Sequence, residues 1–148
     1  MKLRGEGFIQ APVERVWQYL HDPAVLREIT PFVRQLEQVE GSTYTTESEV
    51  KVGPIRGTFR GKLRIEDIEP LKEFVVILEQ GSTMGNSTVQ MRIRLVEEDD
   101  GTRIEYEGDA RMSGLLARMG QRLIGSTVKK VAGEFFTNLQ HRLQEDWA

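Results

Sequence analysis

The sequence contains no cysteine, and this absence excludes several kinds of site. Without thiols the chain forms no disulfide, no thiolate metal centre and no cysteine nucleophile, a composition compatible with a reducing, cytoplasmic location. The two histidines, His21 and His141, lie far apart, and no spacing typical of a metal site, a phosphate loop or a nucleophile elbow occurs. We therefore predict no metal, no cofactor and no catalytic residue.

Long apolar runs and an excess of positive charge are also missing. The longest apolar run covers residues 74–78, far short of the roughly 20 residues that span a bilayer. The first residues include Lys2, Arg4 and Glu6 rather than the apolar segment of a signal peptide. The 20 Lys and Arg against 23 Asp and Glu give a net charge of −3, which argues against a nucleic-acid-binding surface. We expect a soluble intracellular protein that does not bind nucleic acid.

The 148 residues are enough to bury one hydrophobic core, and no linker, repeat or low-complexity segment divides them. We predict a single domain over residues 1–148. Alternation of small or apolar with polar residues predicts a strand over residues 3–11. Helical spacing from Val13 to Leu20, and a second start signal at Asp22 and Pro23, predict two short helices, of which the second covers residues 24–29.

From residue 33 the period is two for some eighty residues, which predicts an antiparallel meander of about six strands. Val52-Gly53-Pro54-Ile55 is typical of a two-residue hairpin. It pairs Tyr44 with Leu63, Ser48 with Phe59 and Glu47 with Arg60. A second hairpin is predicted at Asp100-Gly101, and it pairs Leu95 with Tyr106, Ile93 with Gly108, Met91 with Ala110 and Val89 with Met112.

After Ser113, a predicted N-cap, helical spacing returns and predicts one long amphipathic helix to the end of the chain. The order of strand, two short helices, a run of strands and a final helix predicts an α+β domain. In it, a curved antiparallel sheet wraps its apolar face around the C-terminal helix.

Small residues interrupt that apolar face at Gly57, Gly61, Gly108 and Ala110. Two interpretations stay open: a bulge or close helix packing, and a cavity for a ligand. Four small residues on one concave face favour the cavity, although each residue taken singly is more often ordinary core. Apolar residues with a few hydroxyls are the usual lining of a small-molecule site. The predicted ligand cavity consists of Tyr44, Ser48, Phe59, Gly61, Leu63, Val89, Met91, Tyr106, Gly108, Ala110, Met112, Leu116, Gly120 and Phe135.

An acid/base pair is not apparent on the same face. The acids nearest to the predicted cavity, Glu47, Glu49, Glu105 and Glu107, all fall on the outward parity of their strands. Tyr106 therefore has no expected carboxylate partner inside the sheet. This pattern argues against an enzyme.

The final helix has two unusual features. Gly114, Gly120, Gly125 and Gly133 would soften it, which fits either a lid or close packing against the sheet. Four cations and no acid lie between Met112 and Lys130, beside several apolar residues. Such a basic amphipathic segment is able to lie on an anionic membrane, although a solvated polar face is the more frequent explanation. The residues predicted to contact a membrane are Leu115, Arg118, Met119, Arg122, Lys129 and Lys130.

Three segments together resemble the G-subunit family of carbon monoxide dehydrogenase, within the START and birch-pollen-allergen-like (SRPBCC, polyketide cyclase-like) superfamily. They are the sequence GFIQAPVERVW at residues 7–17, VGP at 52–54 with FRG at 59–61, and GLLARMGQRL at 114–123 with a later Phe135-Phe136. The resemblance implies a helix-grip fold, in which a seven-stranded sheet holds a C-terminal helix around an apolar cavity. It also implies a link to molybdenum-containing CO dehydrogenases, membrane attachment, and lipid-like or quinone ligands.

The hypothesis from the sequence is a non-catalytic carrier or sensor of a hydrophobic small molecule. Its partner would be a membrane redox enzyme, and its location the cytoplasm or the inner face of the membrane. Two alternatives stay open. One is a polyketide cyclase-like enzyme, which a polar, ionisable pocket would favour, and the other is an interaction protein with a vestigial cavity.

Overall fold

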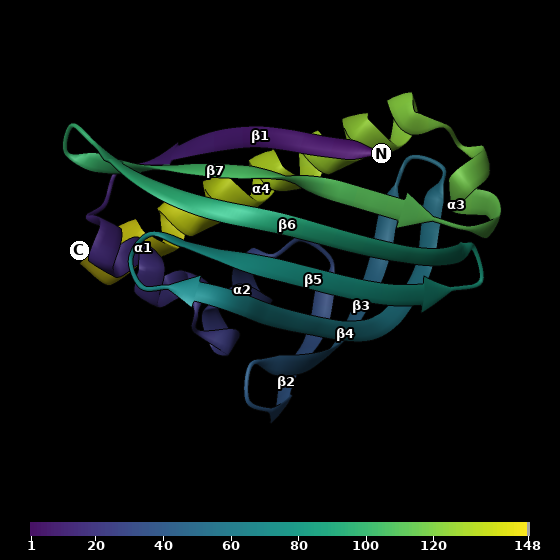
Figure 1. The fold of residues 1–148 in the computed structure, drawn as a ribbon, viewed down its shortest axis with the longest axis horizontal. Coiled ribbons are helices and arrows are strands. Elements are labelled where there is room, and N and C mark those ends of the chain that lie inside the picture. The colour runs from purple at the N-terminus through teal and green to yellow at the C-terminus, as the bar shows by residue number, and fades with distance from the viewer. Residues whose placement is uncertain (148) are drawn as a thin grey trace.

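Within residues 1–147, which the computed structural model describes, seven antiparallel strands form one curved sheet, and the long helix α4 runs along its inner face (Figure 1). The elements are β1 (Lys2–Ile9), α1 (Val13–Leu20), α2 (Pro23–Ile29), β2 (Val33–Glu40), β3 (Thr43–Val52), β4 (Ile55–Glu69), β5 (Glu73–Ser82), β6 (Gly85–Glu98), β7 (Gly101–Met112), α3 (Gly114–Arg118) and α4 (Gln121–Trp147). The strand order is β1-β7-β6-β5-β4-β3-β2. The predicted α+β helix-grip fold is confirmed.

Both short helices begin where the sequence signals place them. α1 follows Pro12, and α2 has Pro23 in its first turn. The carboxylate of Asp22 caps α2, because its Oδ1 accepts hydrogen bonds from the backbone N–H of Ala24 at 3.0 Å and of Val25 at 3.4 Å. The two helices close one end of the space between the sheet and α4 (Figure 1).

The β3–β4 hairpin has the predicted register. Gly53 takes a φ of 54°, and Val52 pairs with Ile55 across the two-residue turn. Tyr44 therefore faces Leu63 and Ser48 faces Phe59. On the outer face Arg60 Nε donates to Glu47 Oε1 at 2.7 Å, as the predicted pairing of these two residues requires.

The predicted register of the β6–β7 hairpin is wrong by two residues. The turn is made by Asp99 and Asp100, with Asp99 at a φ of 54°, and Glu98 pairs with Gly101. The observed pairs are Leu95 with Ile104, Ile93 with Tyr106, Met91 with Gly108 and Val89 with Ala110. Gly101 is small for another reason, since a Cβ there would overlap the Phe8 ring and the backbone of β1. A shift of two residues keeps every side chain on its predicted face.

The predicted single C-terminal helix is interrupted. α3 ends at Arg118, and Gly120, with a φ of 87°, separates it from α4. Ser113 does occupy the N-cap position of α3, but it makes no capping bond, and its Oγ instead accepts from the N–H of Asn86 at 3.1 Å. The N–H of Leu116 donates to the carbonyl of Met84 at 3.0 Å. α3 is thus attached to the β5–β6 turn rather than being a continuation of α4.

The described side chains form two hydrophobic clusters at opposite ends of α4. The first cluster contains the buried residues of α1 and α2 together with Ile9, Leu139 and Leu143. The second cluster lies at the α3 end and contains Ile55, Phe59, Met84, Leu116 and Ile124. On the inner sheet face the first cluster includes Tyr44 and Ile65 and the second includes Phe59, whereas Val89 and Met91 belong to neither.

Candidate functional site

Three neighbouring rows of paired residues cross the middle of the inner sheet face, and we call them the central rows. The first row is Gly108, Met91, Val76 and Ile65; the second is Ala110, Val89, Leu78, Leu63 and Tyr44; the third is Met112, Ser87, Gln80, Gly61 and Thr46. Eight of the residues predicted to line a ligand cavity fall in these rows. Ser48 and Phe59 pair just beyond the third row, and Tyr106 lies one row before the first.

Some apolar side chains of the central rows are incompletely buried. Val89 and Met91 are partly exposed, although they lie on the face that α4 covers, and neither belongs to either hydrophobic cluster. Tyr44, Phe59 and Ala110, by contrast, are buried, with Ala110 only 3% exposed. α4 therefore does not complete the core above Val89 and Met91.

The remaining predicted cavity residues surround this region or lie outside it. Leu116 is buried in the second cluster, and Phe135 packs against the first cluster, which also includes Tyr44 of the central rows. Gly120 is exposed at the break between α3 and α4, where an added Cβ would meet nothing within 4 Å. It does not line the inner face.

The small residues of the central rows have a backbone explanation. A Cβ at Gly61 would overlap the carbonyl oxygen of Glu79, and a Cβ at Gly108 would overlap that of Gln90. At these two positions the physical reason for glycine is the close approach of a neighbouring strand, rather than a bulge or close packing of the helix. The same glycines leave the inner face without a side chain at two points.

Three polar side chains, Thr46, Ser48 and Gln80, interrupt the apolar inner face of the sheet. Thr46 and Ser48 are buried, and Gln80 Nε2 donates to Thr46 Oγ1 at 3.4 Å. The predicted cavity includes Ser48 but neither Thr46 nor Gln80. The parity of Tyr44 and Ser48 already places Thr46 on the inner face, whereas the position of Gln80 depends on the β4–β5 pairing, which no strong turn signal fixes.

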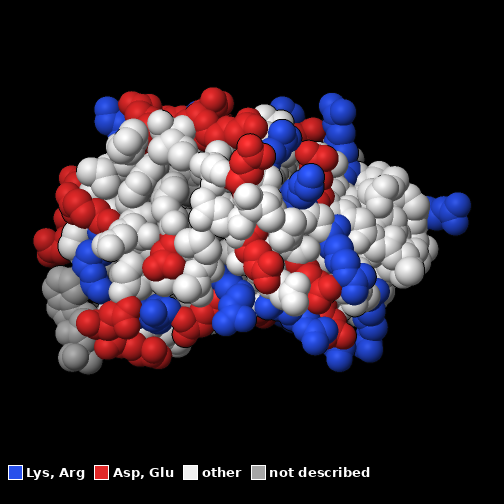
Figure 2. Space-filling model, turned by 90° about the horizontal axis from the view of Figure 1, so that it is seen from below, with Lys and Arg blue, Asp and Glu red and all other residues white. Residues whose placement is uncertain are grey.

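The six residues predicted to contact a membrane do not form one surface. Leu115 is 50% exposed on α3 beside the exposed Arg118, while Met119 is partly buried against the second cluster. Arg122, Lys129 and Lys130 are exposed on α4. Figure 2 shows Lys and Arg side chains gathered toward the end of the molecule that carries α3, and Asp and Glu side chains more frequent toward the other end.

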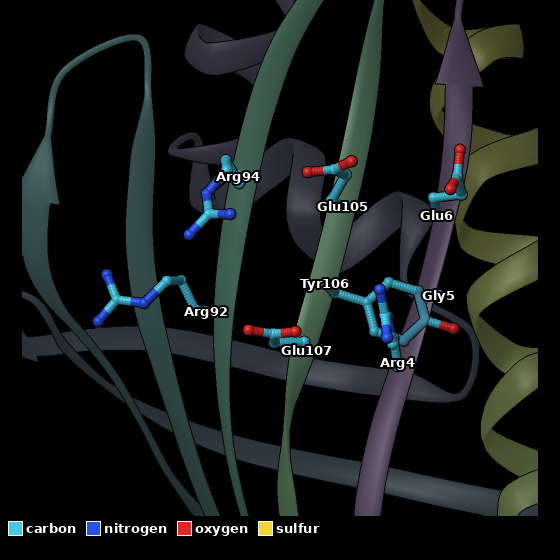
Figure 3. A pocket seen from close by; sticks show the side chains of 8 residues that line it. All are labelled: Arg4, Gly5, Glu6, Arg92, Arg94, Glu105, Tyr106 and Glu107. Atoms are coloured by element: carbon cyan, nitrogen blue, oxygen red, sulfur yellow. The ribbon is translucent and has the colours of Figure 1, made fainter.

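Tyr106 lies at the edge of the central rows and is held by packing. Its ring reaches from β7 to β1 beside Gly5 (Figure 3), where an added Cβ would overlap the phenol, and its centroid is 6.3 Å from that of Phe136. Burial raises the pKa of Tyr106 because it disfavours the phenolate. Among residues 1–147, no hydrogen bond joins a carboxylate to Tyr44 or Tyr106.

The outer face of the sheet carries a shallow, charged depression of about 190 Å³ (Figure 3). Across it Glu107 pairs in register with Arg4 and Arg92, and Glu105 pairs with Glu6 and Arg94. Glu105 and Glu107 thus point outward, as their parity predicts. The pairs of opposite charge stabilise the sheet modestly, whereas Glu6 opposite Glu105 does not.

Metal ligands and membrane-spanning helices are both absent from the described part of the chain. No three His, Asp or Glu side chains in residues 1–147 lie close enough together to hold a metal ion. No helix in the same range is both long and apolar enough to cross a bilayer.

The family model of the carbon monoxide dehydrogenase G subunit (CoxG) matches residues 5–144. This chain belongs to that family. No protein with a curated description matches the sequence. Because the match covers nearly the whole chain, it includes the central rows, α3 and most of α4.

Solved structures show the same fold at low sequence identity. A conserved protein from Geobacillus kaustophilus has a TM-score of 0.94 at 23% identity, covering 98% of this chain and 96% of that one. A START superfamily protein from Mycobacterium smegmatis has a TM-score of 0.77 at 11% identity, covering 97% of both chains. Ara h 8.0201 has a TM-score of 0.72 at 15% identity, covering 98% of both. At these identities the likeness shows the fold alone.

Proposed function

We propose that this protein binds and carries a hydrophobic small molecule, lipid-like or a quinone, between the central rows and α4. The observation that carries the proposal is the partial exposure of Val89 and Met91 on the inner face, between two clusters that are well packed. Apolar surface in contact with water gains about 25 cal/mol per Å² when an apolar ligand covers it. Thr46, Ser48 and Gln80 would orient the ligand through hydrogen bonds, as a few polar groups do in apolar sites.

Binding without turnover fits the distribution of acids. The cyclase-like alternative needs an ionisable pair inside the same space, whereas Glu105 and Glu107 lie on the outer face and Glu47 is paired with Arg60 there. A phenol whose pKa is raised by burial, such as that of Tyr106, is a weak acid and serves better as a hydrogen-bond donor. The role that we propose is therefore that of a carrier.

A filling substitution tests the carrier hypothesis. Val89→Phe adds an aromatic side chain in the proposed ligand space, and phenylalanine is favoured in strands. We expect at least a tenfold loss of affinity for a fluorescent fatty-acyl probe, with a melting temperature that is unchanged or raised. The control is Thr88→Phe, which adds the same ring on the exposed outer face of β6 and should leave binding unchanged.

Two results would contradict the hypothesis. If Val89→Phe melted several degrees lower and still bound the probe, Val89 would already be in a packed core, because overpacking typically costs about 1–3 kcal/mol. If the purified wild type held no small molecule in native mass spectrometry and bound no apolar probe, the carrier function would be wrong.

We further propose that the α3 end contacts an anionic membrane and there assists a molybdenum hydroxylase or CO dehydrogenase-type redox enzyme. The name of the family points to such an enzyme. The exposed Leu115 and Arg118, at an end where cations gather (Figure 2), would bind the membrane weakly and in a salt-dependent way. Arg118→Glu should abolish sedimentation with anionic liposomes at low salt, whereas Arg27→Glu, a matched charge reversal on α2, should not. Equal sedimentation of the two variants would refute the membrane contact.

A further inference from the structure

An open groove of about 880 Å³ lies between the start of β1 and the first half of α4. Its lining includes Lys2 from β1, Asp109 from β7, and Arg122, Gly125, Ser126 and Lys129 from α4. Gly125 keeps the groove open on the helix side, since an added Cβ would meet only the end of the Met1 side chain at 3.3 Å. Sequence reasoning assigned Arg122 and Lys129 to a membrane surface and did not place them beside β1.

The groove has an excess of positive charge. Asp109, the acid in its lining, is already paired with the Met1 amino group at 3.0 Å, and that hydrogen bond lowers the pKa of the Asp109 carboxyl. Within the described residues, none of Lys2, Arg122 and Lys129 has an ion-pair partner. The first turn of α4 adds the positive end of a helix dipole. An anion in the groove would therefore meet three unpaired cations.

The groove is also next to the proposed ligand space. The Met1 amino group donates to the carbonyl of Ala110 at 2.9 Å, and the N–H of Ala110 donates to the carbonyl of Met1 at 2.8 Å. Ala110 is the first residue of the second central row, and the Met1 side chain packs against the second hydrophobic cluster. Met1 therefore lines the groove, pairs with the backbone of the second central row and packs on the apolar side chains of the second cluster.

We propose that this groove binds the anionic head, a carboxylate or a phosphate monoester, of an amphipathic ligand. The proposal rests on the proposed carrier function and narrows its ligand to molecules with an acidic head and an apolar tail. Lys129 and Arg122 would contact the head from α4, and Lys2 would contact it from β1. Arginine and lysine bind such oxygens through charge-assisted hydrogen bonds.

The test compares a dansyl-labelled undecanoic acid with its methyl ester, which has the same tail and no charge. We expect the acid to bind about tenfold more tightly than the ester at low salt, and this preference to fade as salt is added. Lys129→Gln and Arg122→Gln should each weaken binding of the acid about two- to fivefold and leave binding of the ester unchanged. Lys130→Gln, a neighbouring exposed cation outside the groove, is the matched control and should change neither.

The outcomes separate this proposal from the carrier function. Equal binding of acid and ester, or equal losses in Lys129→Gln and Lys130→Gln, overturns the anionic head site and leaves the carrier function intact. If neither molecule binds, the carrier function fails, and this proposal fails with it. A second experiment with vesicles shows whether the ligand is a membrane lipid. If the wild type extracts a labelled lysophosphatidate from vesicles and Lys129→Gln does not, the ligand is a membrane lipid. Binding of the acid without such extraction indicates a free amphiphile.

Discussion

Two glycines near the C-terminal helix should respond in opposite directions to the same substitution. Gly120 separates α3 from α4 with a φ of 87°, a conformation that costs alanine about 1–2 kcal/mol. Gly133 is exposed in the interior of α4, and an added Cβ there would meet nothing within 4 Å. Alanine in place of glycine inside a helix stabilises by roughly 0.5–1 kcal/mol. We expect Gly133→Ala to raise the stability of the fold and Gly120→Ala to lower it.

Thermal unfolding followed by circular dichroism measures both changes. For a chain of 148 residues, 1 kcal/mol corresponds to a shift in Tm of about 3–4 °C. Gly120→Ala should thus melt a few degrees below the wild type and Gly133→Ala a few degrees above it. An increase in Tm with Gly120→Ala would show that α3 and α4 form one continuous helix in solution, as the sequence alone predicts. The separate attachment of α3 to the β5–β6 turn would then be wrong.

Further predictions concern pH, a buried hydroxyl and a core contact. His21 donates from Nδ1 to the carbonyl of Trp17 at 2.9 Å and stacks on Trp17, and desolvation lowers its pKa below that of the unfolded chain. The free energy of unfolding should therefore fall as the pH drops below about 6.5, because the unfolded chain then binds a proton that the folded chain excludes. In urea titrations His21→Phe should remove this dependence of stability on pH. Thr102 is fully buried, and its Oγ1 donates to the carbonyl of Ala11 at 2.9 Å. Thr102→Val should therefore lose about 1–3 kcal/mol of stability in the same assay. If it kept full stability, this hydrogen bond would not contribute to the stability of the fold. Leu139→Ala, at a fully buried position of the first cluster, should lose about 2–5 kcal/mol, and a much smaller loss would mean that the cluster is loosely packed.

The two long hairpins show how far local sequence determines the fold. Gly53 and Pro54 supply the backbone angles of a two-residue turn, so the register of β3 and β4 follows from the turn itself. At the other hairpin Asp99 takes the positive φ, and Gly101 is required by the neighbouring strand β1. A glycine that is required by a strand distant in the sequence cannot be recognised from the residues around it. The faces were nevertheless predicted correctly, because alternation depends on parity and not on the exact turn.

The candidate site was predictable in composition and less so in its boundaries. Parity alone brought Leu63, Val89 and Met91 to one face, where the structure places them in the central rows. For Gly61 and Gly108 the sequence favours a ligand cavity as the reason for glycine, whereas in the structure the backbone of the neighbouring strand excludes a side chain. Ala110, another predicted cavity residue, is buried, and its backbone pairs with that of Met1, so we expect a phenylalanine there to be overpacked. Val89 is the better choice because part of its side chain is exposed.

The partly buried side of α4 changes in side-chain size along the helix. Ile124 anchors the first half of the helix in the second cluster, and Phe135, Phe136, Leu139 and Leu143 anchor the second half in the first cluster. Between these anchors the partly buried positions of the helix carry residues no larger than valine, namely Gly125, Thr127, Val128, Val131 and Ala132. Short side chains at these positions reach less far toward the inner sheet face than leucine or phenylalanine would. A sequence selected only for stability would place larger apolar residues here, because each would add buried surface at about 25 cal/mol per Å². These small residues between the two anchors are what the proposed carrier function would explain.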